Sequence, residues 1–321
     1  MPHPAAPRMH IMEGYLPLVH ALAWTAASTP SVVQGARLLA RQPGQRDARM
    51  RLSAASAFTF LLSALKIPSV AGSCSHPTGT ALGTLLVGPA VMAPVTALVL
   101  TFQALLLAHG GITTLGANVF AMGIVGPWVA VAVFQLLRRV GLPFLWSAGA
   151  AAVIGDLSTY LTTSFQLALA HPEAAGSVLA AFTRFASLFA ITQLPIAFLE
   201  GALTVLVLRA LPVETLGTMA LLQPRVTRDA VNRTSRRGVV LPAAIALVAV
   251  AIVGLGLTPG QFTGTDDRAR ALVSAAPLPR LIDTPVPSAT TERVIFAAQG
   301  AAALVILLLT VAGVRRRHER A

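Results

Sequence analysis

A series of apolar runs, separated by short basic or proline-rich stretches, constrains the fold of this chain more than any other feature. Seven runs meet or approach the roughly 20 residues that a transmembrane helix needs: 16–40, 50–67, 114–137, 143–170, 177–208, 239–258 and 294–314. Only 11% of the residues are charged, whereas a soluble domain carries about 25%. The sequence therefore predicts an all-α membrane protein whose surface faces lipid.

The apolar region 77–110 decides the number of spans. It reads either as one long span or as two short segments broken at Gly88–Ala90, the sequence GPA. With the N-terminus outside, only the two-segment reading places every arginine cluster on the cytoplasmic side, as the positive-inside rule favours. The clusters are Arg41, Arg46, Arg49 and Arg51; Arg138 and Arg139; Arg225, Arg228, Arg233, Arg236 and Arg237; and Arg315, Arg316 and Arg317. We expect the first segment, about 78–88, to be short and covered by protein rather than lipid.

The spans group into two units. Residues 9–210 are expected to form a seven-span helical bundle with one short segment, and residues 239–321 a two-span hairpin with an extracytoplasmic loop at 259–293. A basic cytoplasmic linker, 211–238, joins them, and residues 1–8 read as a leader or a mis-assigned start. About nine transmembrane segments result, with the N-terminus outside and the C-terminus in the cytoplasm, in a multi-pass protein of the bacterial cell membrane.

The residues present disfavour several function classes. The net charge of +12 is spread between apolar runs rather than over an aromatic-laced polar face, so nucleic acid is not an expected partner. Cys74 is the only cysteine, which excludes an internal disulfide and a multi-cysteine metal site. The sequence contains no P-loop, dinucleotide fingerprint or HExxH motif. These absences disfavour a nucleotide-binding protein and a zinc protease.

Three histidines fall on the predicted outer face. His10 lies in MHIMEG, His76 in SVAGSCSHPTGT and His109 in AHGGITTLGAN. Imidazoles without an acidic cluster suit a nitrogen-ligated transition metal rather than Mg²⁺ or Ca²⁺, which prefer oxygen ligands. His109 could instead cap a helix or form hydrogen bonds around a metal site. His171 precedes Pro172 in a predicted outside loop, and we expect it to be solvated.

A chain that begins at Met9 offers a compact chelate. The free amine of Met9 loses its proton at modest cost, the His10 amide nitrogen follows one peptide unit later, and the His10 Nδ1 closes a second ring. His76 can supply the fourth corner of a plane of nitrogens, which points to Ni(II), Cu(II) or low-spin Co(II) rather than tetrahedral Zn(II). In a chain that keeps the leader, a peptide bond consumes the Met9 amine. Pro2 and His3 could then chelate in the same way, but without a helix entry to hold them over His76.

Three stretches resemble the CbiM family: MHIMEGYLP at 9–17, IPSVAGSCSHPTGTALGTLLVGPAVM at 67–92 and FQALLLAHGGITTLGANVFAMGIVGP at 102–127. The resemblance extends over about residues 9–210. More weakly, GTDDRARA at 264–271 and ERVIFAAQGA at 292–301 are similar to the small CbiN subunit. The CbiM family is the substrate-capture membrane subunit of energy-coupling-factor cobalt transporters, and its close relatives carry nickel.

The resemblance implies a CbiM–CbiN fusion that imports Co(II) for cobalamin biosynthesis, or Ni(II) by the same architecture. It implies metal ligation by the Met9 amine, the His10 amide and imidazole, and His76. His109, Ser75 and Asn118 are expected around these ligands. It also implies a transporter subunit rather than an enzyme, with no permanently bound cofactor. The implied partners are a transmembrane coupling subunit and two cytoplasmic ATPases on other chains. The eight-residue leader departs from the family pattern, and it bears directly on the Met9 amine.

Two other function classes stay open. An intramembrane metalloenzyme would need a general base beside a metal-bound water, and the candidates Glu13, Asp156, Glu173 and Glu200 lie in no recognisable motif. A purely structural or assembly subunit would make the histidines incidental. Acidic residues within spans are costly and tend to be functional. Asp156 could pair with a donor inside the bundle, and Glu200 could serve folding or coupling.

Overall fold

The computed structural model describes residues 11, 13–41, 46–64, 67–68, 74–106 and 109–210. The predicted leader, linker and hairpin lie outside these residues, as do Met9 and His10. The helices are α1 (Leu18–Arg41), α2 (Arg46–Ala64), α3 (Thr80–Val87), α4 (Pro89–Leu106), α5 (Leu115–Asn118), α6 (Gly126–Arg139), α7 (Phe144–Ala170) and α8 (Val178–Ala210). The π-helical segment η1 (Val119–Val125) joins α5 to α6, and the 3-10 turn η2 (Pro172–Ala174) lies between α7 and α8.

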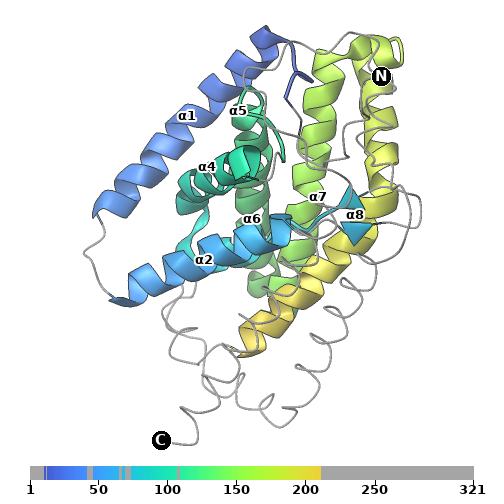
Figure 1. Cartoon of the computed structure of the whole chain (residues 1–321). Coiled ribbons are helices and arrows are strands. Elements are labelled where there is room, and N and C mark those ends of the chain that lie inside the picture. The colour runs from blue at the N-terminus through green and yellow to red at the C-terminus, as the bar shows by residue number, and fades with distance from the viewer. Residues whose placement is uncertain are drawn as a thin grey trace, which may run out of the picture.

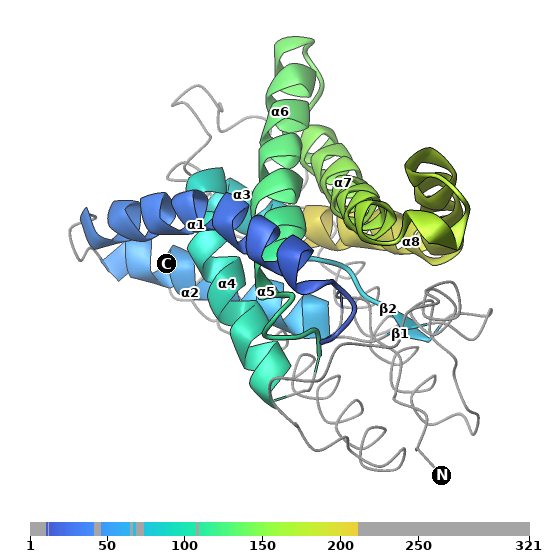
Figure 2. The ribbon, with the colours of Figure 1, turned by 90° about the horizontal axis from the view of Figure 1, so that it is seen from above.

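The helices form a bundle in which α5 and α6 are central (Figure 1). Seen from above, α1, α2 and α4 lie on one side and α7 and α8 on the other (Figure 2). The fold departs from the all-α prediction in one detail. The strands β1 (Ile67–Pro68) and β2 (Cys74–Ser75) form a short antiparallel pair, in which Ile67 is opposite Ser75 and Pro68 is opposite Cys74.

Three stretches of the described helices are long and apolar enough to cross a membrane. They are Pro89–Leu106, Leu115–Arg139 and Thr192–Arg209, and Val178–Ala190 is a shorter apolar helix. Each apolar segment predicted within residues 9–210 coincides with a helix. The count of nine spans and the assignment of inside and outside remain predictions.

The predicted break in region 77–110 lies at Gly88. The helix α3 ends there, where Gly88 has a φ of 87° and donates its N–H to the Thr84 carbonyl at 2.8 Å. Glycine adopts a positive φ at low cost, and Pro89, which begins α4, fits the first turn of a helix but cannot continue the previous one. The two-segment prediction is therefore confirmed, and α3 is short and buried from Thr80 to Leu86.

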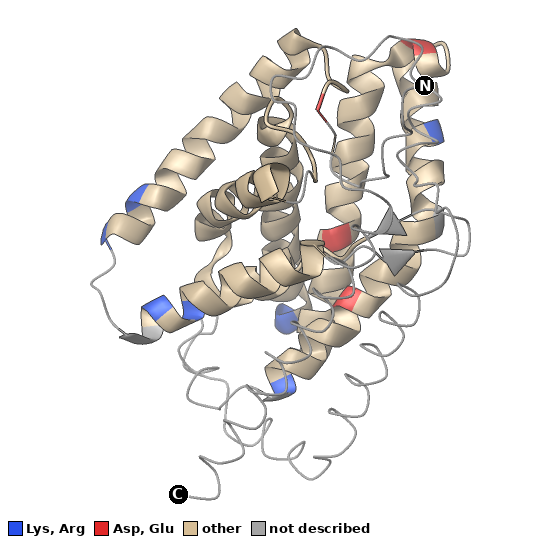
Figure 3. Cartoon of the chain, viewed as in Figure 1, with Lys and Arg blue, Asp and Glu red and all other residues tan. Residues whose placement is uncertain are grey.

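Basic residues of the described helices gather at one end of the bundle (Figure 3). Arg41 lies in the last turn of α1, Arg138 and Arg139 in the last turn of α6, and Arg209 in the last turn of α8. Arg184 is an exception, because it lies near the start of α8. This clustering has the form that the positive-inside rule describes for a cytoplasmic end.

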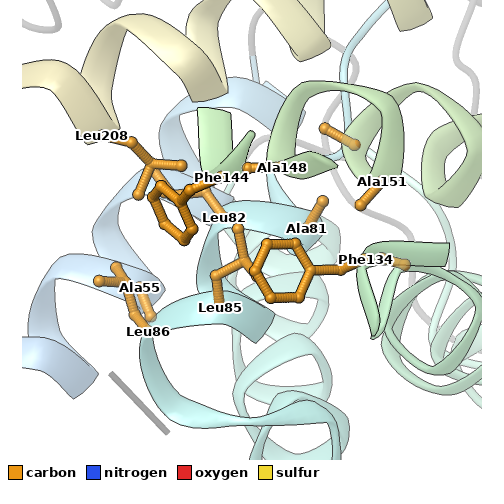
Figure 4. Packing of buried hydrophobic residues seen from close by; sticks show 12 residues of the cluster. Ala55, Ala81, Leu82, Leu85, Leu86, Phe134, Phe144, Ala148, Ala151 and Leu208 are labelled. Carbon is orange, nitrogen blue, oxygen red and sulfur yellow. The ribbon is translucent and has the colours of Figure 1, made fainter. Parts of the chain in front are cut away.

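An apolar core joins α3 to α6, α7 and α8 (Figure 4). Leu82 and Leu85 of α3 pack with Phe134, Phe144 and Leu208. The rings of Phe134 and Phe144 meet edge to face, with centroids 5.7 Å apart. This core fixes the position of α3, whose N-terminal end carries the loop with His76.

The helices α7 and α8 approach each other closely at two glycines. A Cβ atom on Gly201 would lie 2.7 Å from Cγ2 of Val153 and 2.9 Å from the Gly149 carbonyl oxygen. Lipid is as apolar as the side chains that it surrounds, so helices in a bilayer associate through close packing rather than through the exclusion of water. Small residues at this contact therefore matter for the stability of the α7–α8 pair.

Replacing Gly201 with leucine should separate α7 from α8. We expect Gly201→Leu to lower the free energy of unfolding by about 1–3 kcal/mol, because overpacking forces neighbouring atoms apart. Thermal unfolding in detergent measures the change. Ala202, the next residue on α8, is exposed, so Ala202→Leu is the matched control and should behave like the wild type. Equal destabilisation by both variants would contradict the close contact.

Candidate metal centre

The backbone of Ile11 is held by the side chain of Asn118. The Ile11 N–H donates to Oδ1 of Asn118 at 3.0 Å, and Nδ2 of Asn118 donates to the Ile11 carbonyl at 3.0 Å. The hydroxyl of Thr114 donates to the same carbonyl. The Asn118 amide thus bonds both backbone groups of Ile11, as a neighbouring strand would. Ile11 is only 4% exposed. Asn118 comes directly before η1, and π-helical segments are frequent at functional sites.

Glu13 makes a second contact between the N-terminal segment and the segment that leads into α5. Its Oε2 accepts a hydrogen bond from the backbone N–H of Thr113 at 3.0 Å. A Cβ atom on Gly111 would lie 2.5 Å from the Glu13 backbone nitrogen, so the close approach requires glycine at this position. Ile11 and Glu13 therefore both contact the segment 111–118.

His76 is buried at the end of the loop that precedes α3. Its exposed fraction is 1%, and its Nδ1 lies 3.1 Å from the Pro77 carbonyl oxygen. A proton on Nδ1 would donate to this oxygen and leave the lone pair on Nε2, which is the usual arrangement of a metal-binding imidazole. The hydroxyl of Tyr160, on α7, donates to the His76 carbonyl at 2.6 Å. Both the ring and the backbone of His76 are thus fixed.

His109 lies beside His76, as the sequence predicted for the outer-face histidines. The two ring centroids are 5.1 Å apart, with an angle of 64° between the ring planes. His109 is 2% exposed, and its backbone N–H donates to the Gln103 carbonyl at the end of α4. The two imidazoles therefore meet edge to face in a buried place.

The contacts around Ile11 and those around His76 belong to one region. Ile11 and Tyr160 share a buried apolar cluster with Leu16 and Phe185, and Tyr160 also binds the backbone of His76. Three non-helical stretches, at residues 11–17, 74–79 and 109–114, thus come together although they are far apart in the sequence.

The described residues supply part of the predicted ligand set. Met9 and His10 lie outside them, and only the backbone of Ser75 is described, in β2. Within the part of the chain that the structure covers, no group of three or more His, Cys, Asp or Glu side chains could hold a metal ion. His76 and His109 can contribute imidazole nitrogens, and the remaining ligands of a complete centre would have to come from elsewhere in the chain.

The prediction that His171 is solvated is wrong. His171 is 4% exposed, its Nε2 lies 2.7 Å from the Tyr15 carbonyl oxygen, and its Nδ1 lies 3.0 Å from Oε1 of Glu173. A backbone hydrogen bond at Glu173 and, after it, the interaction with His171 lower the pKa of the Glu173 carboxyl. His171 therefore ties the connection between α7 and α8 to the segment that leads into α1. No sequence pattern indicated this role, because Tyr15 contributes only its backbone.

Two buried acidic residues lie in the bundle near the His76 loop. Glu200 of α8 accepts hydrogen bonds from the backbone N–H groups of Thr78 and Gly79, and the carboxyl of Asp156 on α7 interacts with that of Glu200. Their position within apolar runs was the signal that marked them in the sequence, but it did not identify these partners. Glu200 binds backbone donors here, as Glu13 does, which gives little support to either as a general base.

Removing the Asn118 side chain should release the segment at Ile11. Asn118→Leu leaves the buried Ile11 N–H without an acceptor, which costs about 1–3 kcal/mol, while the Ile11 carbonyl keeps the Thr114 hydroxyl as a donor. Asn118→Asp keeps an acceptor for the N–H but sets a buried carboxylate oxygen against the Ile11 carbonyl oxygen, so it should also open the segment. Hydrogen–deuterium exchange at residues 11–17 measures the opening. Thr101→Val, which removes a hydroxyl bonded only within α4, is the control, and unchanged exchange in Asn118→Leu would contradict this role.

Comparison with known proteins assigns this arrangement to a family. Residues 10–214 match CbiM, described as the cobalt uptake substrate-specific transmembrane region. The chain is 55% identical over 204 residues to cobalt transport protein CbiM 1 of Pelobacter propionicus. The aligned region covers 63% of this chain and 90% of that relative. It is 52% identical over 221 residues to cobalt transport protein CbiM of Streptomyces coelicolor. This alignment covers 68% of this chain and 95% of that relative.

A solved structure supports the same assignment. The crystal structure of a truncated transition metal transporter is 28% identical in sequence, covers 62% of this chain and 96% of that one, and superimposes with a TM-score of 0.55. The match with the CbiM family includes His76, His109 and Asn118, together with all of the described helices. The chain therefore belongs to the CbiM family of membrane proteins.

Proposed function

We propose that this chain is the membrane substrate-binding component of an energy-coupling-factor transporter that takes up Co(II). Membership of the CbiM family supports a role in metal uptake. The relatives at 55% and 52% identity are named cobalt transport proteins, which favours cobalt. Ni(II) transport by the same architecture is the alternative, and it is one of the outcomes of the experiment below.

The proposed ligands are the amine of Met9, as the first residue of the working chain, the amide and imidazole nitrogens of His10, and the imidazole of His76. The observation that carries this proposal is the hydrogen bonding of Ile11 to Asn118. Two residues of extended chain span at most about 7 Å, so ligands on Met9 and His10 stay close to a fixed point. That fixed point belongs to the same buried region as His76.

The chemistry of these donors suits a late transition metal. Amine, amide and imidazole nitrogens from two consecutive residues close two chelate rings, and His76 completes a plane of four nitrogens. Such a plane suits Ni(II), Cu(II) and low-spin Co(II), whereas Zn(II) prefers a tetrahedron and Mg²⁺ prefers oxygen. The metal is the transported cargo in this proposal, so the site must hold it selectively and also release it.

The predicted neighbours of the metal would act on its ligands. Both polar groups of the Asn118 side chain bind the Ile11 backbone, so Asn118 would orient the chelating residues rather than bind the ion. His109 would lie beside the ligand His76 and hydrogen bond around the centre. Ser75, the residue before His76, is the third proposed neighbour.

Transport also needs parts that the described bundle does not supply. We propose that a transmembrane coupling subunit and two cytoplasmic ATPases, all on other chains, drive reorientation of the bundle and release of the ion. The CbiN-like hairpin at 239–321 would assist loading or opening of the site through its outer loop at 259–293. Cobalamin biosynthesis would be the destination of the imported cobalt.

Metal uptake by cells tests the proposed function. Cells that express the chain with its coupling subunit and ATPases should accumulate radioactive cobalt. His10→Ala and His76→Ala should each reduce accumulation to the level of cells that lack the chain, because each removes ligand nitrogens from the four. A further chain, extended at Met9 by residues that cannot be cleaved, should also fail, because it has no free amine there.

The controls separate ligand loss from misfolding. His20 lies in the first turn of α1 and is partly exposed, so His20→Ala should retain uptake. All variants are compared at equal amounts in the membrane. Uptake that is unchanged in both His10→Ala and His76→Ala would overturn the metal-capture proposal, and uptake of nickel with exclusion of cobalt would identify Ni(II) as the cargo.

A further inference from the structure

The N-terminal end of α3 is capped by a side chain from another helix. Gly79, the residue before α3, has a φ of 69° and no side chain that could accept from the first N–H groups of the helix. The only local acceptor among the described residues is the Thr78 hydroxyl, which accepts from the Thr80 N–H at 3.4 Å. The carboxyl of Glu200, on α8, accepts instead from the N–H groups of Thr78 and Gly79, the latter at 3.0 Å, and from the Thr78 hydroxyl. Backbone donors at the start of a helix need such a partner, because no water reaches them in this buried place.

Glu200 thereby holds the residues that directly follow His76. Tyr160, on α7, holds His76 itself by donating its hydroxyl to the His76 carbonyl at 2.6 Å. Two consecutive helices, α7 and α8, therefore hydrogen bond to the chain between His76 and Gly79. Neither contact touches the imidazole, so each can act on a metal only through the orientation of that ring.

Asp156 is the second buried acidic residue near this arrangement. It lies one helical turn before Tyr160 on α7, so both side chains lie on the same side of the helix. Asp156 is fully buried near the Glu200 carboxyl, but neither of its own carboxyl oxygens forms a hydrogen bond with the described residues. The hydrogen bonds that hold the His76 loop therefore come from Glu200 and Tyr160.

A second cation site at this acidic pair is the competing interpretation. A cation would have to take the place of the donors that already occupy Glu200, and the positive ends of two backbone N–H groups would repel it. The hydrogen bonds therefore favour a role in positioning over a role in binding an ion.

We propose that Glu200 and Tyr160 are positioning residues that orient His76 and set the affinity of the metal site. This inference rests on the proposed function, in which His76 is a metal ligand. It also links metal affinity to α7 and α8, which contact each other closely at Gly149 and Gly201. A shift of these two helices relative to α3 would move the His76 backbone and weaken the site.

Metal titration of the purified full chain, beginning at Met9 and held in lipid nanodiscs, tests this inference. Co(II) and Ni(II) are added separately, and the d–d absorption bands report both the apparent Kd and the ligand field. Glu200→Ala should raise the apparent Kd about 10–100-fold, the range typical for loss of a residue that orients a metal ligand. The saturated spectrum should keep the wild-type bands, because the ligands themselves remain.

Conservative variants distinguish positioning from general destabilisation. Tyr160→Phe removes only the hydroxyl donor and should raise the Kd while it leaves the ring packing intact. Glu200→Gln, which keeps one acceptor, should fall between the wild type and Glu200→Ala. Thr204→Val, one turn after Glu200 and also buried on α8, is the matched control and should bind normally.

The outcomes separate this inference from the function on which it rests. Loss of binding in His76→Ala together with a wild-type Kd in both Glu200→Ala and Tyr160→Phe would overturn the positioning role alone. Wild-type binding in His76→Ala would overturn the proposed ligand set, and the positioning role with it. If Glu200→Ala does not fold, the Kd values of Glu200→Gln and Tyr160→Phe decide between these results.

Discussion

The interior of a bilayer contains no water to satisfy backbone N–H and C=O groups, and this constraint governs the part of the chain where the site lies. Most of the described bundle meets it with helices. The exceptions are the non-helical stretches at residues 11–17, 74–79 and 109–114, whose polar groups are met by buried side chains. Asn118 serves Ile11, Glu200 serves Thr78 and Gly79, and His171 serves the Tyr15 carbonyl. Buried polar side chains, which are costly in a membrane protein, thus stabilise its non-helical segments by hydrogen bonding to their backbone.

The same hydrogen bonds give the proposed site its location. A metal centre that uses residues before Ile11 needs the segment that follows them to be held in one place. Asn118 holds Ile11, and the close approach of Gly111 to Glu13 holds the next described residue. Tyr160 holds the His76 backbone, and Glu200 holds the residues that follow it. The site is therefore assembled from segments far apart in the sequence on a rigid frame of packed helices.

Sequence reasoning succeeded where a local signal was sufficient. Gly88 followed by Pro89 marks a helix break through backbone chemistry alone, and the arginine clusters required that break. The apolar runs located the helices of the bundle because span length and composition are local properties. The proximity of His76 to His109 followed from assigning both to one face of the membrane.

The rest depended on tertiary contacts that no local pattern encodes. His171 looked solvated because it sits in a polar connection beside Pro172, yet its ring is buried against a distant backbone carbonyl. Glu200 and Asp156 stood out as acids in apolar runs, but Thr78, the partner of Glu200 on the His76 loop, is more than a hundred residues away in sequence. The antiparallel pair of β1 and β2 is too short to show an alternating pattern.

X-ray absorption spectroscopy of the cobalt-loaded chain beginning at Met9 tests the central claim most directly. The account predicts a first shell made only of nitrogen, with the outer-shell scattering of two imidazole rings, one from His10 and one from His76. A first shell dominated by oxygen, or one that keeps two imidazoles after His76 is replaced, would contradict it.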